Sequence, residues 1–200
     1  MKLIAVTDDQ HTVEALAEKI TTIKDVIDFV QIREKTKSVR ELLTLIESLL
    51  INGVEKEKII INDRLDVALC MGIPTVHLPE HGLPIQMIKQ RYPHIRVGCS
   101  VHSFEKATEA EIHGADYVLY GHCFETSSKQ GLPPNGIEPI LHMKEEMKIP
   151  VYAIGGITLE NIQSIKLVEA DGIALMSSIF NADNPLLITK KLNEAIQHEE

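Results

Sequence analysis

Residues 151–178 read VYAIGGITLENIQSIKLVEADGIALMSS, and this stretch contains the pattern that decides the fold. It opens with a short apolar run, Val151–Ile154, and ends with a second run, Gly172–Leu175, each followed by small residues. Neither run alternates with polar residues, as expected for strands that are covered on both faces. The longer segment between them is expected to be helical. The stretch therefore predicts a strand–helix–strand unit.

The same alternation extends over the rest of the chain. Short apolar runs rich in β-forming residues recur, separated by longer segments. With the two runs above, eight strands are predicted in total. The six others are Leu3–Val6, Phe29–Ile32, Ile59–Ile61, Thr75–Leu78, Arg96–Ser100 and Tyr117–Tyr120.

The segments between the runs carry helix signals. Apolar residues recur at i, i+3, i+4 and i+7 in Val13–Ile20, and Val39–Leu50 has a second apolar stripe of this kind. Ser38 and Glu41 have the spacing of a capping box at the start of the second helix. Pro185 is suited to the first turn of the last helix. These signals predict a helix after each strand.

Eight strand–helix units in 200 residues predict an α/β fold, a single (β/α)₈ TIM barrel formed by one domain over residues 1–200. A doubly wound open sheet is the main alternative, because it uses the same alternation with fewer units. The strand count and the lack of a G-x-G-x-x-G motif after the first run favour the barrel. The sequence contains no linker or low-complexity tract that would indicate a second domain.

Composition excludes several classes of function. The 20 Lys and Arg against 29 Asp and Glu give a formal net charge of −9, which argues against nucleic-acid or anionic-membrane partners. The N-terminus lacks the pattern of a signal peptide, and no run approaches the roughly 18 apolar residues of a membrane span. Three widely spaced cysteines do not suggest a disulfide framework. We expect a cytoplasmic protein that forms a homo-oligomer, with a dimer favoured.

Small residues follow the seventh and eighth strands. Gly155 and Gly156 follow the seventh, and Ser177 and Ser178 follow the eighth. TIM barrels commonly bind phosphate at these two places, through backbone N–H groups and the start of a short helix. A glycine pair can also be merely a turn, and two serines merely a helix cap. Their occurrence together favours a phosphate site.

Polar residues also follow the second and third strands. Arg33 and Lys35 are two residues apart, so both side chains are expected on the same side, where they suit a carboxylate or a second phosphate. A solvated rim with Glu34 as local partner is the alternative. Asn62 suits a hydrogen bond to a ligand, and Asp63 suits either a ligand or a helix cap.

His122 follows the sixth strand and is the candidate for proton transfer near neutral pH. Ser100 and His102, after the fifth strand, are candidates for the lining of the pocket. His77 and His81 have the spacing of a metal pair, but Pro79 between them argues against a helix that carries both. Cys123 is interpreted as a small filler. We therefore predict no metal site and no cofactor.

Six segments together resemble the thiamine-phosphate synthase superfamily in order and spacing. Each segment is weak evidence by itself, but the set is specific and spans nearly the whole chain. The segments are Gln31–Lys35, Ile61–Ala68, Val76–Leu78, Gly98–His102, Gly121–Thr126 and Ala153–Ile157.

The sequence departs from the synthase pattern at two places. Synthases carry a Gly-Gln turn and an acidic metal ligand after the fourth strand, where this chain has Pro79-Glu80-His81-Gly82. They carry a proline where this chain has His122. Loss of a metal ligand and gain of an acid–base group are typical of the sister branch, the TenI-type thiazole tautomerases. The resemblance therefore implies an isomerase of thiamine biosynthesis.

The substrate that this resemblance implies is a carboxythiazole phosphate tautomer, aromatised by a proton shift without metal. His122 would move the proton, and the glycine and serine pairs would hold the phosphate. Asn62, Ser100 and His102 would line the site. The substrate carboxylate would meet Arg33, Lys35 or the loop formed by Thr126, Ser127, Ser128 and Lys129.

Two other functions remain open at this point. The chain would be a thiamine-phosphate synthase if it coupled a pyrimidine diphosphate to a thiazole phosphate with magnesium. That reaction would use a diphosphate site on Gln31, Arg33, Lys35 and Lys129. Alternatively, the chain would be a non-catalytic regulator that binds a thiamine precursor and a protein partner.

Overall fold

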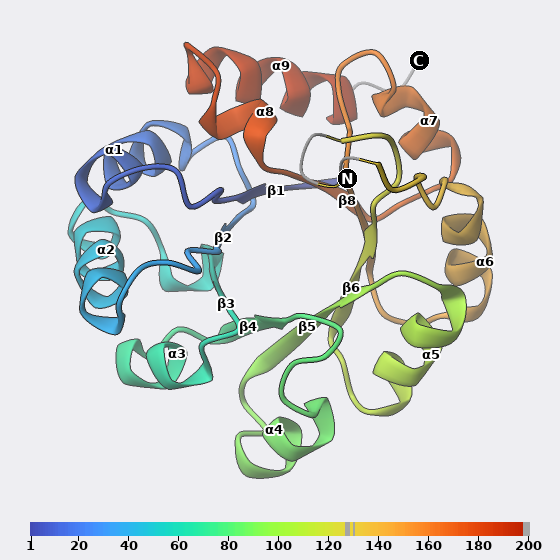
Figure 1. Cartoon of the computed structure of the whole chain (residues 1–200), viewed down its shortest axis with the longest axis horizontal. Helices are drawn as coiled ribbons and strands as arrows, with labels where there is room; N and C mark the ends of the chain where they lie inside the picture. The colour runs from blue at the N-terminus through green and yellow to red at the C-terminus, as the bar shows by residue number, and fades with distance from the viewer. Residues whose placement is uncertain (127–128, 130, 198–200) are drawn as a thin grey trace.

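The computed structural model describes residues 1–126, 129 and 131–197, and its strands form a closed ring inside a ring of helices (Figure 1). The strands are β1 (Lys2–Val6), β2 (Phe29–Ile32), β3 (Ile59–Asn62), β4 (Thr75–Leu78), β5 (Arg96–Val101), β6 (Tyr117–Gly121), β7 (Val151–Ile154) and β8 (Gly172–Leu175). The helices are α1 (Val13–Ile23), α2 (Val39–Ile51), α3 (Leu65–Met71), α4 (Ile85–Arg91), α5 (Phe104–Ile112), α6 (Glu138–Glu146), α7 (Ile162–Leu167), α8 (Ser177–Phe180) and α9 (Pro185–Gln197). A 3₁₀ helix, Lys56–Lys58, precedes β3.

The strands pair in parallel in sequence order, and β1 pairs with β8 to close the barrel. This topology confirms the predicted (β/α)₈ barrel and excludes the open sheet. The predicted strand ends are correct to within one residue. At the carboxyl ends, β3, β5 and β6 each extend one residue further than predicted, to Asn62, Val101 and Gly121.

Successive side chains along each strand point to opposite faces, and this separates two cores. In β1, Leu3 and Ala5 pack outward in the main core between strands and helices, whereas Ile4 and Val6 belong to a second cluster. That smaller cluster fills the barrel interior. Its buried members are Ile4, Val6, Ile60, Tyr117, Leu119, Tyr152 and Ala174.

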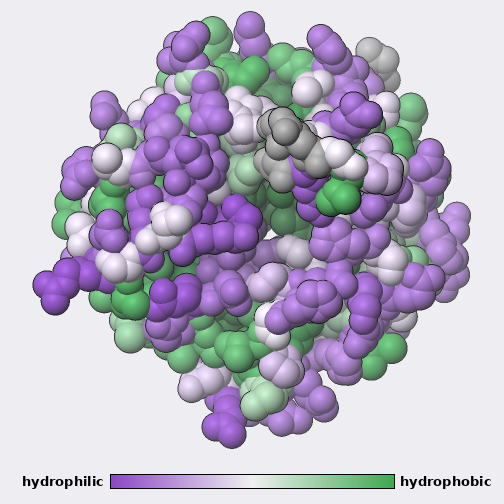
Figure 2. Space-filling view, in the orientation of Figure 1, coloured by the Kyte–Doolittle hydropathy of each residue, from purple (hydrophilic) through white to green (hydrophobic). Residues whose placement is uncertain are grey.

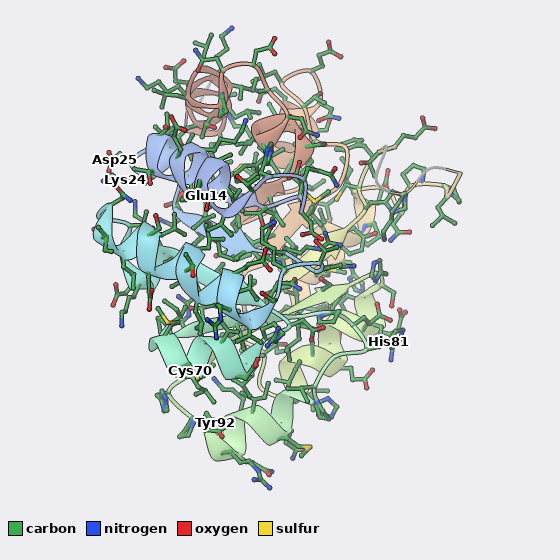
Figure 3. The ribbon with its side chains drawn as sticks, turned by 60° about the vertical axis from the view of Figure 1, so that its left-hand side comes forward. Glu14, Lys24, Asp25, Cys70, His81 and Tyr92 are labelled. Atoms are coloured by element: carbon green, nitrogen blue, oxygen red, sulfur yellow. The ribbon has the colours of Figure 1, made fainter. Side chains whose placement is uncertain are left out.

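The helix signals of the sequence are confirmed. Ser38 and Glu41 form a complete capping box at the start of α2. Pro185 is the first residue of α9. Cys70 on α3 is exposed, whereas Tyr92 after α4 is partly buried against the main core (Figure 3). No helix in the described part of the chain is long and apolar enough to cross a membrane.

Candidate active site

One cavity of about 870 Å³ lies where the strands end, and its lining comes from all eight strands or from the residues that follow them. The space-filling view shows a hollow near the centre of this face, bordered mainly by hydrophilic residues (Figure 2). Ser127 and Ser128 lie outside the described residues. Every other predicted site residue lines this cavity: Arg33, Lys35, Asn62, Ser100, His102, His122, Thr126, Lys129, Gly155, Gly156, Ser177 and Ser178.

Arg33 and Lys35 form a cationic part of the lining. Their expected alternative partner, Glu34, is buried and bonds instead to the ammonium group of Lys37 and to the backbone N–H of Asp9. Within the described residues, neither Arg33 nor Lys35 has an ion pair. The two cations are therefore available to an anionic ligand, which is one of the two interpretations that the spacing left open.

A pair of side-chain amides lies beside these cations. Gln31 Nε2 donates to Asn62 Oδ1 at 2.9 Å, and both residues line the cavity. Gln31 is 2% exposed, and its Oε1 has no hydrogen-bond partner among the described residues. A buried carbonyl oxygen without a donor is costly, so Gln31 Oε1 is a candidate acceptor for an N–H group of a ligand.

Hydrogen bonds between polar and charged side chains connect three loops at the rim of the cavity. His102 Nδ1 lies 2.6 Å from Glu80 Oε2, and Lys129 Nζ lies 3.0 Å from His102 Nε2. Because an ammonium group can only donate, His102 accepts from Lys129 at Nε2 and donates from Nδ1 to Glu80. His102 is thus a bridge between two charged residues rather than a free ligand-binding group.

The glycine pair after β7 allows close packing as well as lining the cavity. A Cβ atom at Gly156 would lie 2.3 Å from the carbonyl oxygen of Glu125. Both glycines have positive φ, 103° at Gly155 and 67° at Gly156. Ser177 and Ser178 begin α8, and the first N–H groups of a helix have no acceptor within it. This end of the cavity is compatible with the predicted phosphate site.

His122 lies next to this end, at the end of β6, and is 6% exposed. Its Nε2 is 3.4 Å from the carbonyl oxygen of Leu132, which can only accept, so Nε2 carries a hydrogen. Its Nδ1 is buried and has no partner among the described residues. The imidazole ring is therefore hydrogen-bonded at Nε2, whereas Nδ1 has no partner among the described residues.

The other histidine and cysteine candidates do not line the cavity. His77 is buried inside the barrel, whereas His81 lies at the surface on the loop after β4 (Figure 3). Cys123 is 1% exposed in the main core, and burial raises the pKa of its thiol to about 12. These properties agree with its interpretation as a small filler.

Magnesium is the ion that the synthase alternative implies. Asp63, with φ of 55°, and Glu80 both line the cavity, but Glu80 is bonded to His102. The described residues contain no group of three or more His, Cys, Asp or Glu side chains that could hold a metal. Magnesium is often held by one or two carboxylates together with substrate phosphates. Asp63 fits an ion that binds together with a diphosphate.

Sequence reasoning missed Lys37 and left Glu80 without a role, although both line the cavity. Lys37 lies in the same short segment after β2 as Arg33 and Lys35, and this group of cations was the available signal. The pairing of Glu80 with His102 had no signal in the sequence, because it joins the ends of β4 and β5 across 22 positions of the chain.

Comparison with known proteins identifies the family. The family model described as thiamine monophosphate synthase matches residues 3–179. The thiamine-phosphate synthase of Pyrococcus horikoshii is 32% identical and covers 98% of this chain and 95% of its own. That of Chlorobium luteolum is 40% identical over 79% of this chain and 76% of its own. The solved structure of thiamine phosphate pyrophosphorylase from Pyrococcus furiosus superposes with a TM-score of 0.83 at 31% identity, covering 98% of this chain and 95% of its own.

These relatives contradict the predicted isomerase class, because they are named as synthases and not as tautomerases. The two departures that suggested an isomerase, at His122 and at Pro79–Gly82, do not affect the residues expected to form the diphosphate site of a synthase. Gln31, Arg33 and Lys35 line the cavity together with Lys129. The chain therefore belongs to the thiamine monophosphate synthase family, whose members named here are enzymes of thiamine biosynthesis.

Proposed function

We propose that this chain is a thiamine-phosphate synthase that couples a pyrimidine diphosphate to a thiazole phosphate. The cavity supports a reaction with two anionic substrates because it has two separate places for an anion. Arg33 and Lys35 lie after β2, and the glycine and serine pairs lie after β7 and β8. A volume of about 870 Å³ is within the range of pockets that enclose whole small-molecule ligands.

The observation that best supports this proposal is the hydrogen-bonded amide pair of Gln31 and Asn62. Amide oxygen and nitrogen can exchange places in the Gln31–Asn62 bond, but in either orientation the pair offers one acceptor and one donor to the cavity. An aminopyrimidine presents the complementary edge, an amino group beside a ring nitrogen. Its diphosphate would meet Arg33 and Lys35, on the same side of the chain as Gln31.

In the coupling, a bond from carbon to the thiazole nitrogen forms and the bond from that carbon to a diphosphate oxygen breaks. Negative charge grows on the departing diphosphate, where Arg33 and Lys35 stabilise it. Magnesium held by Asp63 would supply further charge neutralisation there. At the other end, Gly155, Gly156 and the start of α8 hold the thiazole phosphate.

The test is a separate measurement of KM for each substrate in Gln31→Leu. We expect KM for the pyrimidine diphosphate to rise roughly tenfold, since one ligand hydrogen bond is lost, with KM for the thiazole phosphate unchanged. Cys70→Ser, at an exposed position on α3, is the matched control. An equal rise of both KM values would contradict the assignment of this end of the cavity to the pyrimidine.

A further inference from the structure

Three polar side chains form a hydrogen-bonded row through the barrel interior to the cavity. Tyr117 Oη on β6 lies 3.1 Å from His77 Nδ1 on β4, and His77 Nε2 lies 2.8 Å from Ser100 Oγ on β5. Tyr117 and His77 are 2% and 1% exposed and do not line the cavity, whereas Ser100 does. The row therefore connects a buried phenol to a hydroxyl that a ligand can reach.

Burial keeps both inner groups uncharged. It lowers the pKa of His77 to about 3, with a smaller contribution from the charge of Arg33, and it raises the pKa of Tyr117 far above its ordinary value. A neutral imidazole has one N–H donor and one acceptor nitrogen. Two arrangements of hydrogens are then available to the row, and they differ in the direction in which every bond is donated.

The surroundings of Tyr117 distinguish these two arrangements. If His77 Nδ1 carried the hydrogen, Tyr117 would accept it, and the phenolic hydrogen would need another acceptor. Within the described part of the chain, the Tyr117 hydroxyl has no hydrogen-bond partner besides His77. A buried donor without an acceptor is unfavourable, so Tyr117 donates to Nδ1 and the ring hydrogen resides on Nε2.

We propose that Tyr117 and His77 are positioning residues that make Ser100 a hydrogen-bond donor to the ligand. With Nε2–H donating to Ser100 Oγ, the hydroxyl hydrogen of Ser100 is not used within the row and is free to point into the cavity. The ligand atom that it meets must carry a lone pair, as an unprotonated ring nitrogen or a phosphate oxygen does. The role of Ser100 in the coupling reaction rests on the proposed function, whereas the tautomer of His77 does not depend on it.

The packing around the row holds it in place. A Cβ atom at Gly98 would lie 1.9 Å from Cζ of Tyr117, so the phenol ring occupies space that only glycine leaves open. The ring also stacks on His77, with centroids 5.7 Å apart, and meets Tyr152 edge-on at 5.4 Å. Register places Gly98 beside both His77 and Tyr117. The side chains of the row are thus held in place before a ligand binds.

The first test is imidazole ¹⁵N NMR of the ligand-free protein, with His77 assigned by its absence from His77→Gln. We expect a protonated Nε2 and an unprotonated Nδ1. In Tyr117→Phe this preference should be lost, whereas Tyr152→Phe, which removes a hydroxyl from the same cluster, should retain it. A hydrogen on Nδ1 in the wild-type protein would overturn the proposal, whatever reaction the enzyme catalyses.

The second test is a double-mutant cycle in the coupling reaction. Tyr117→Phe should lower kcat/KM roughly fivefold to tenfold in the wild-type background and leave it unchanged in Ser100→Ala, because the hydroxyl that it orients is then missing. His77→Gln, which keeps a nitrogen donor near the Nε2 position, should lose less than His77→Leu. An equal loss in both backgrounds would show a merely structural role and overturn the proposal. Absence of coupling in the wild-type enzyme would contradict the proposed function instead, and the NMR result would still decide the direction of the row.

Discussion

A Cβ atom on Gly155 would lie 2.4 Å from the Cβ atom of His122, so the loops that follow β7 and β6 are in direct contact. Gly155 also has φ of 103°, which side chains rarely adopt. We therefore expect Gly155→Ala to lower the free energy of unfolding by about 2–4 kcal/mol, through backbone strain and overpacking together. Urea denaturation measures this loss.

Gly131→Ala separates the two contributions. Gly131 has φ of 78°, but a Cβ atom there would meet nothing within 4 Å. This variant should therefore show the backbone penalty alone, about 1–2 kcal/mol. If both variants lost the same free energy of unfolding, overpacking of the added Cβ atom against His122 would not contribute to the loss in Gly155→Ala.

Lys35→Met should weaken binding of the diphosphate substrate. Lys35 lines the cavity and is exposed, so the loss is moderated by solvent, and we expect KM for that substrate to rise about threefold to tenfold. The effect should shrink as salt concentration increases. Arg91→Met, which removes an exposed cation at the end of α4, is the control. A similar change in both variants would assign the effect to overall charge.

His77 should make the protein sensitive to acid. Its pKa is about 3 when folded and about 6.5 in an unfolded chain, so between these values only the unfolded state binds the proton. The contribution of His77 to stability is complete above pH ~6.5 and decreases by about 1.4 kcal/mol per pH unit as the pH falls towards 3. Urea unfolding of His77→Gln at several pH values should show a correspondingly shallower dependence, and an unchanged slope would contradict the burial of a neutral His77.

The three thiols should differ in reactivity. Burial raises the pKa of Cys99 to about 11 and that of Cys123 to about 12, whereas Cys70 is exposed. At pH 8 we expect one thiol to react rapidly with a disulfide reagent in the folded protein, and this reaction should disappear in Cys70→Ser. Rapid reaction of two or more thiols would mean that the barrel opens more readily than its packing indicates.

Much of this architecture follows from the sequence because strand and helix periodicities are local properties. Arg33 and Lys35 both line the cavity, but so does Glu34 between them, so their alternate spacing is not what places them there. Pro185 correctly marked the start of the last helix. The loops after β7 and β8 were expected to hold an anion because barrels share this geometry. These predictions depend on residues close together in the chain.

The sequence could not predict interactions that depend on how strands meet. Gln31 Nε2 donates to Asn62 Oδ1 on the neighbouring strand, and Gln31 Oε1 has no partner among the described residues. His77, Ser100 and Tyr117 form a row because β4, β5 and β6 are adjacent and in register. The predicted enzyme class was wrong because it was inferred from two local departures. The residues expected of a synthase are instead distributed over β2, β3 and the loop after β6.

Synthase activity is tested by incubating the purified chain with magnesium, the pyrimidine diphosphate and the thiazole phosphate, and separating the products by chromatography. We expect thiamine phosphate and diphosphate in equal amounts, formed only when both substrates are present. No coupled product above the enzyme-free control, or conversion of a thiazole phosphate that proceeds equally well without the pyrimidine, would contradict the proposed function.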